Sequence, residues 1–115
     1  MIKANELRIG NYLKSEDGVV VKIDALSIYH IWDKSKEYLP IPLTEEWLLK
    51  FGFEKVINGG NVDYCKPLFL GEHYSETELI INFEYGSFLG WEEINTPIYV
   101  HTLQNLYFAL AREEL

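Results

Sequence analysis

The sequence predicts an α+β fold in which β-rich segments are separated by helices. Alternating apolar residues bounded by glycine turns indicate strands within residues 11–33 and again within residues 53–99. Apolar residues at helical spacing indicate helices after Thr44 and from Val100 onward. Pro40 and Pro42 divide the two parts, because each proline favours extended backbone and cannot sit inside a helix.

The first part, residues 1–39, predicts a small SH3-like barrel or curled sheet. A short helical turn could begin it, within ANELRIGNYL. Asp17-Gly18 is a strong turn signal at the centre of a hairpin in NYLKSEDGVVVKID. The segment LSIYHIWD predicts a third strand, with Ile28, His30 and Trp32 on one face.

The second part, residues 40–115, predicts a short helix, an antiparallel meander and a C-terminal helix. Thr44 is a plausible N-cap for TEEWLLKFGF, and Gly52 is a natural stop. FEKVINGGNVDYCK predicts a hairpin around its two glycines. LFLGEHY and ELIINFEYGSF predict further strands, and GWEEINTPIYV continues the sheet or forms a loop. Together, residues 1–115 predict one compact domain with these two sub-units.

The C-terminal segment VHTLQNLYFAL predicts a helix with an unusual polar face. Its core face and its opposite face follow from a 100° rotation per residue. The core face holds Leu103, Leu106, Tyr107 and Leu110; the opposite face, our candidate interaction face, holds His101, Gln104, Asn105, Phe108 and Arg112. Amides and a ring can pack and hydrogen-bond without adding charge, as interface cores often require. Either this face packs against the N-terminal β unit, which the small chain favours, or it docks a second copy or another protein.

Composition and charge narrow the class of protein. The formal net charge is -8 and is uneven: residues 1–57 hold nine acids and eight bases, and residues 58–115 hold nine acids and two bases. Such a second half repels a phosphate backbone, so nucleic-acid binding is not expected. No stretch approaches the roughly 20 apolar residues of a membrane span. With a single cysteine and no apolar leader at the start, we expect a soluble, cytosolic protein.

The sequence contains no recognisable catalytic or cofactor motif. Cys65 with His73 or His101 would give a nucleophile and a base, but their spacing matches no known pattern. A metal site would draw on the side chains of GEHYSETE, namely Glu72, His73, Glu76 and Glu78. Trp91 beside Glu92-Glu93 faintly suggests a carbohydrate site, whereas a buried tryptophan next to a loop is the ordinary explanation. We therefore expect no cofactor, no metal and no catalytic residues.

Three blocks of the sequence, NELRIGNYL, IPLTEEWLLKFGFEK and VHTLQNLYFALAREEL, together span nearly the whole chain. They resemble a family of small proteins encoded in phages, prophages and mobile elements of gut Bacteroidetes-type bacteria. The chain departs from that family at Thr102, where a glutamine is common, and in its ending AREEL, where Thr-Gly usually precedes Glu-Glu-Leu. The resemblance implies a mobile-element origin and a bacterial cytoplasm, and it implies no activity.

These observations lead to a functional hypothesis with two alternatives. The leading hypothesis is a non-enzymatic interaction module that binds an unidentified protein, for which a second copy forming a homodimer is one candidate. The first alternative is a small hydrolase that uses Cys65 with a histidine. The second is an acidic inhibitor of a host DNA-binding protein, which would mimic the charge of DNA.

Overall fold

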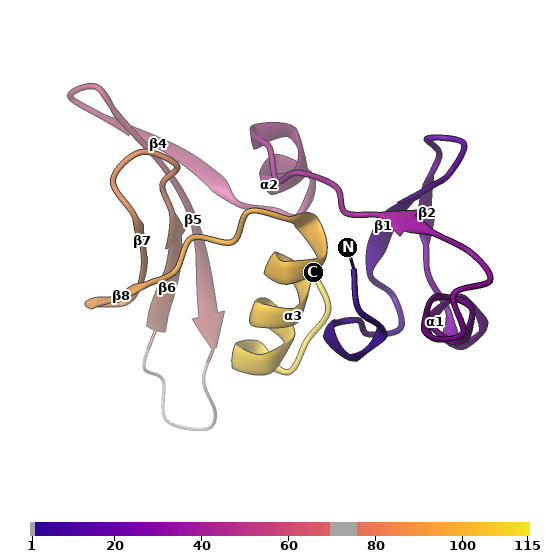
Figure 1. Ribbon diagram of the computed structural model, residues 1–115. Helices are drawn as coiled ribbons and strands as arrows, with labels where there is room; N and C mark the ends of the chain where they lie inside the picture. Colours follow the sequence, from indigo (N-terminus) through magenta and orange to yellow (C-terminus); the bar gives the residue numbers. More distant parts are fainter. Residues whose placement is uncertain (1, 70–75) are drawn as a thin grey trace. The chain divides into compact units, whose positions relative to one another are not determined.

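The computed structural model describes residues 2–69 and 76–115, and it confirms the α+β class (Figure 1). The described residues form two antiparallel sheets, of three and five strands, and three α-helices. None of the helices in these ranges has the length and apolar character that crossing a membrane requires. The part of LFLGEHY that falls within residues 70–75 lies outside the described residues.

The chain divides into two compact units. Unit 1 comprises Met1–Leu43 and Ile98–Leu106, and unit 2 comprises Thr44–Pro97 and Tyr107–Leu115. The boundary therefore falls after Leu43, close to the predicted division at residue 39. The sequence did not predict that the last helix, α3 (Val100–Ala111), begins in unit 1 and ends in unit 2. A single compact domain for residues 1–115 stays a prediction.

Unit 1 is built on a three-stranded sheet with the order β2-β1-β3. Its elements, in chain order, are η1 (Ala4–Glu6), β1 (Tyr12–Ser15), β2 (Val20–Lys22), α1 (Ala25–Trp32) and β3 (Tyr38–Leu39). The helical turn near the start and the hairpin around Asp17-Gly18 are confirmed, and Gly18 has the positive φ of +79° that such a turn favours. The core of this unit forms around Ile2, Leu13 and Ile23.

The predicted strand over LSIYHIWD is wrong, because this segment is helix α1. Asp24 caps the helix: its carboxylate accepts a hydrogen bond from the Ser27 amide at 2.9 Å, and the Ser27 hydroxyl accepts one from the Asp24 amide. This capping box outweighs the β-like alternation of the residues that follow. The residues packed toward the core are Ile28 and Ile31, which are three apart as a helix requires.

The start of α3 is held in unit 1 by backbone pairing. The Leu43 amide donates to the Ile98 carbonyl at 2.9 Å, and the Val100 amide donates to the Ile41 carbonyl at 2.8 Å. Between them, Pro42 and Tyr99 form an isolated antiparallel bridge. The segment around Pro42 is thus extended, as the prolines predicted.

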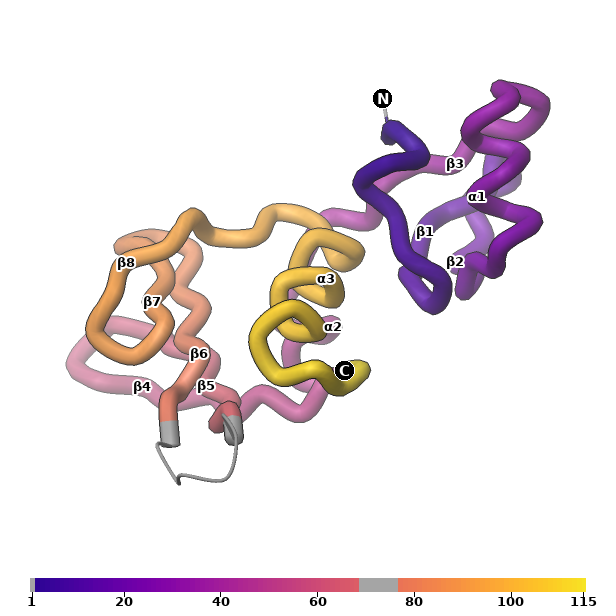
Figure 2. Tube along the Cα trace, turned by 90° about the horizontal axis from the view of Figure 1, so that it is seen from below, coloured from indigo at the N-terminus to yellow at the C-terminus, as the bar shows by residue number. Residues whose placement is uncertain are grey.

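Unit 2 contains a five-stranded antiparallel meander, whose strands follow one another in chain order (Figures 1 and 2). Its elements are α2 (Glu45–Lys50), β4 (Glu54–Asn58), β5 (Asn61–Phe69), β6 (Glu76–Ile81), β7 (Ser87–Leu89) and β8 (Glu92–Ile94). The helix after Thr44 and the meander are confirmed. The β4–β5 hairpin turns at Gly59 and Gly60, both of which have positive φ.

One predicted strand ends earlier than expected. In ELIINFEYGSF, Leu79 and Ile81 are fully buried, but the strand stops at Ile81. The Asn82 side-chain oxygen accepts hydrogen bonds from the Glu84 and Tyr85 amides, each at 2.9 Å. These side-chain hydrogen bonds replace the backbone hydrogen bonds of the sheet, and the chain turns away from β6. Tyr85 is therefore exposed.

Candidate binding groove

The polar face of α3 is mostly internal to unit 1. Gln104, which is only 2% exposed, accepts a hydrogen bond from the Tyr12 amide at 2.8 Å and donates one to the Gly10 carbonyl at 3.1 Å. Asn105 donates to the Glu6 carbonyl at 2.9 Å and accepts from the Asn11 side chain at 2.8 Å. The amides thus bond the N-terminal β unit, which is the first of the two interpretations of this face.

His101 is also buried, at 3% exposure. Its ring stacks on Tyr99, with the centroids 5.8 Å apart, and its Nε2 lies 3.8 Å from a carboxylate oxygen of Glu6. Within the described residues, its Nδ1 has no hydrogen-bond partner. Burial lowers the pKa of His101 more than the nearby Glu6 carboxylate raises it, so the neutral ring is favoured.

The five residues of the candidate interaction face differ in exposure. His101 and Gln104 are buried within unit 1, so their side chains cannot contact an external partner. Asn105 is partly buried and bonds residues of the same unit. Phe108 and Arg112 belong to unit 2 and are exposed. Arg112 has a left-handed φ of 58° just beyond the helix. The structure thus does not bring the five residues together as one exposed face.

Cys65 lies on β5, opposite Glu54 on β4 and Ile80 on β6. Burial raises the pKa of its thiol, and the carboxylates of Glu78, Asp63 and Glu54 raise it further. This environment stabilises the thiol over the nucleophilic thiolate. Of the metal-site candidates, Glu72 and His73 lie outside the described residues; among the described residues, no three His, Cys, Asp or Glu side chains are grouped to hold a metal ion.

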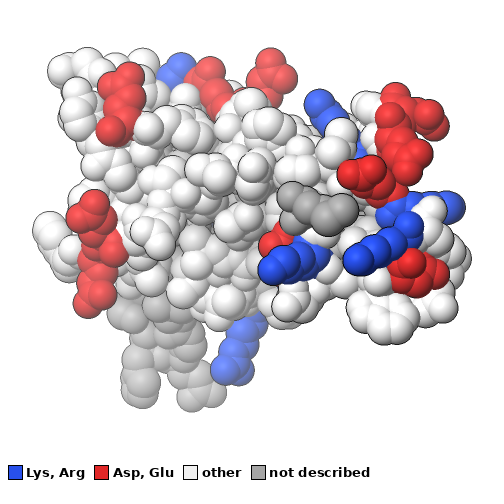
Figure 3. Space-filling view, viewed as in Figure 1, with Lys and Arg blue, Asp and Glu red and all other residues white. Residues whose placement is uncertain are grey.

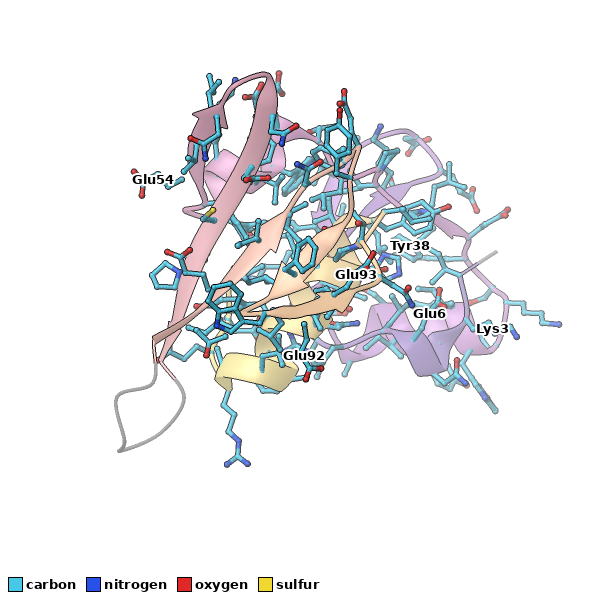
Figure 4. All side chains as sticks on the ribbon, turned by 90° about the vertical axis from the view of Figure 1, so that its left-hand side faces the viewer. Lys3, Glu6, Tyr38, Glu54, Glu92 and Glu93 are labelled. Atoms are coloured by element: carbon cyan, nitrogen blue, oxygen red, sulfur yellow. The ribbon has the colours of Figure 1, made fainter. Side chains whose placement is uncertain are left out.

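A groove of about 570 Å³ opens on unit 1. It lies between the N-terminal segment and the end of α1 that leads into β3. Its apolar lining comes from Ile2, Ala4, Ile31, Trp32 and Tyr38, and its polar lining comes from Lys3, Asn5, Lys34, Lys36 and Glu37. The charged lining residues are three lysines and one glutamate. Beside them, the carboxylates of Glu6 and Glu16 accept hydrogen bonds from the backbone amides of Lys3 and Glu37. Lys3 and Tyr38 are labelled in Figure 4.

Trp32 is the largest side chain of the groove and is 69% exposed. Its ring lies near that of Tyr29, one helical turn earlier, with the centroids 6.0 Å apart. Leu26 is exposed a further turn back on the same helix. These three side chains form a stripe of exposed apolar surface along α1, and Trp32 at its end also lines the groove.

Lys34 lines the groove and has a strained backbone conformation. Its φ is 63°, in the left-handed region that glycine normally occupies after a helix. The Ser35 amide donates to the His30 carbonyl at 3.0 Å and the Lys34 amide donates to the Ile31 carbonyl at 3.3 Å, which completes a Schellman motif. Glycine would adopt this conformation with less strain than the lysine that occupies it.

Unit 2 presents different chemistry. Trp91 at the β7–β8 turn is 99% exposed, so the expectation of a buried tryptophan is wrong. The carboxylates of Glu92 and Glu93 follow it and are also exposed (Figure 4). A second pocket of about 150 Å³, lined by Lys55, Tyr64, Asn82 and their neighbours, is too small for most ligands.

The two units differ sharply in charge. Unit 1 contains six acidic and six basic residues, whereas unit 2 contains twelve acidic and four basic residues. The whole formal charge of -8 therefore resides in unit 2. On the face that Figure 3 views, charges of both signs lie side by side over unit 1.

Comparison with known proteins does not assign the chain: no family model, no curated protein and no solved structure matches it. The groove is thus identified by its geometry alone. Sequence reasoning missed it because the segment that forms one wall was predicted to be a strand. The exposed Leu26, Tyr29 and Trp32, spaced three apart, were the signal that could have revealed it.

Proposed function

We propose that the chain is a non-enzymatic protein-binding module whose groove on unit 1 takes an acidic segment of a partner with an aromatic or apolar anchor. The observation that carries the proposal is a groove whose lining combines apolar and aromatic side chains with three lysines. A buried ring with a polar, charged surround is the usual composition of the energetic centre of a protein interface. In this proposal the module acts in the cytoplasm of a bacterial host, as the sequence resemblance implies.

The charge of the groove favours a protein partner over nucleic acid. Both would bring anionic groups to Lys3, Lys34 and Lys36. A nucleic acid, however, extends its phosphates well beyond one groove, and unit 1 as a whole has no net positive charge. A short acidic segment needs only the lysines that line the groove.

The experiment measures binding of a short fluorescent peptide that has one tryptophan flanked by glutamates. Fluorescence anisotropy should show saturable binding to the wild type, weakened about tenfold or more by Lys34→Glu/Lys36→Glu. The matched control, Lys14→Glu/Lys22→Glu, changes the net charge equally within unit 1 but lies outside the groove. Equal binding by both double variants, or no binding by the wild type, would contradict the proposal.

The hydrolase alternative receives no support from Cys65, because carboxylates and burial both raise the pKa of its thiol. We predict that Cys65 in the folded protein reacts with iodoacetamide more slowly than free cysteine at the same pH, since only the thiolate reacts. Mass spectrometry over time measures this rate. Reaction faster than free cysteine would favour the hydrolase instead.

The acidic-inhibitor alternative is favoured by one observation, the concentration of all the net charge in unit 2. It predicts capture of a basic, DNA-binding protein, with an affinity that falls steeply as salt rises. Binding of such a protein that is insensitive to salt, or unaffected by reversing acidic residues of unit 2, would exclude it.

A further inference from the structure

We infer that the occupant of the groove is a second copy of this chain, which inserts the tip of its β7–β8 hairpin. This inference rests on the proposed function, because it names the partner of the same groove. Three features carry it: an exposed tryptophan at the tip, carboxylates beside that tryptophan, and the matching lining of the groove.

The tip presents a tryptophan in a defined position. Leu89 pairs with Glu92, so that Gly90 and Trp91 form a two-residue turn, and Gly90 supplies the positive φ of 61° that this turn needs. The turn holds Trp91 at 99% exposure, with almost no contact to its own unit. A tryptophan held out on a short hairpin is a preorganised anchor, because little backbone freedom is lost when it binds.

The charges of the tip and of the groove are complementary. Glu92 and Glu93 are exposed next to Trp91. The groove offers Lys3, Lys34 and Lys36 beside its apolar lining. Because consecutive strand residues point to opposite faces, the indole in the groove would bring one of these carboxylates toward the lysines, and pairing of opposite charges favours such a contact.

The dimensions of the groove also suit the tip. A volume of about 570 Å³ lies within the range of pockets that hold a small molecule, and hence a large side chain with its neighbours. Tip and groove are different surfaces, so the contact is head-to-tail. Such a contact generates a closed ring or an open chain of copies.

Sedimentation velocity over a range of protein concentrations tests the inference. The wild type should associate as its concentration rises. Trp91→Ala and Lys34→Glu/Lys36→Glu should each weaken association about thirtyfold, the loss typical of a central interface residue. Two controls should associate like the wild type: Tyr85→Ala, which removes another exposed aromatic ring of unit 2, and Lys14→Glu/Lys22→Glu. Circular dichroism verifies that each variant is folded.

Mixing the two defective variants is the sharper test. Trp91→Ala retains a groove, and Lys34→Glu/Lys36→Glu retains a tip, so the mixture has one intact contact and should form a 1:1 dimer that grows no further. A wild type that stays monomeric at every concentration, or a mixture that stays monomeric, overturns the inference. If the glutamate-flanked tryptophan peptide still binds the groove in that case, the proposed function stands without a second copy as the partner; if it does not, both fall.

Discussion

At the scale of single residues, the amides of α3 explain how its helix is fastened within unit 1. The Gln104 side chain bonds the Tyr12 amide and the Gly10 carbonyl, in the manner of a neighbouring strand. Buried backbone groups need such partners, because water cannot reach them. A lysine or glutamate at this position would bring a charge into the same buried place. The side-chain amides of Gln104 and Asn105 are therefore explained by the hydrogen bonds that they form within unit 1.

We predict that Gln104→Ala lowers the free energy of unfolding by about 2 kcal/mol, because it leaves two partly buried backbone groups without their side-chain partner. Urea denaturation monitored by circular dichroism measures this change. Thr102→Ala, at an exposed position of the same helix, is the control and should shift stability by less than about 0.5 kcal/mol. Similar losses for both variants would show that the hydrogen bonds of Gln104 are unimportant.

His101 predicts a pH dependence of stability. Its folded-state pKa lies below the ordinary value of 6.5. As pH falls through about 6.5, the unfolded chain takes up a proton that the folded chain does not. The contribution of His101 to stability is therefore full above that pH and is lost as pH falls toward the folded-state pKa.

The test compares the wild type with His101→Gln between pH 7.5 and pH 5, a window of roughly one pH unit or more on either side of an ordinary histidine pKa. The wild type should lose more stability across this window than the variant. Parallel stability curves would mean that His101 does not titrate differently in the two states.

Lys34 predicts opposite effects on stability and on binding. Lys34→Gly should raise the free energy of unfolding by about 1 kcal/mol, because glycine adopts the left-handed conformation without strain. It should also weaken binding of the glutamate-flanked tryptophan peptide, since the groove loses an ammonium group. Lys36→Gly is the control: it removes a charge at a position without positive φ and should give no gain in stability. A Lys34→Gly variant that is no more stable would contradict the assignment of strain.

At the scale of elements, the meander and two of the three α-helices were predictable from sequence. The glycines at the β4–β5 turn and the apolar spacing after Thr44 are local signals, so they determine the turn and the helix independently of tertiary contacts. Helix α1 was not predicted, because eight residues of mixed β-branched and aromatic character fit both periods and a side-chain cap decided between them. The groove could not be predicted either, since it depends on α1 being a helix.

The capping box of α1 is a target for an element-scale prediction. Asp24→Ala removes the acceptor of the Ser27 amide and should lower the midpoint of thermal unfolding, while Asp24→Asn retains an acceptor and should lower it less. Because Ile31 and Trp32 line the groove, fraying of α1 should also weaken peptide binding in the alanine variant. If the alanine variant has a clearly lower midpoint of thermal unfolding but binds the peptide as the wild type does, peptide binding does not depend on the stability of α1.

At the scale of the whole molecule, charge is divided between the units instead of being spread evenly. The sequence halves indicated this asymmetry, but only the folded boundaries show that unit 1 is neutral and unit 2 carries the full charge of -8. The part of α3 that belongs to unit 1 adds no Lys, Arg, Asp or Glu to it. An acidic unit with an exposed tryptophan and a neutral unit with an apolar groove lined by three lysines are complementary surfaces for one another in separate copies.

The central claim is that the groove of unit 1 is a binding surface, and NMR mapping tests it most directly. The glutamate-flanked tryptophan peptide is titrated into the ¹⁵N-labelled protein, and the backbone amide shifts are followed. The claim predicts that the largest changes cluster at Lys3, Ile31, Trp32, Lys34 and Tyr38, and that they disappear in Lys34→Glu/Lys36→Glu. Changes centred elsewhere on the chain, or no changes at all, would contradict it.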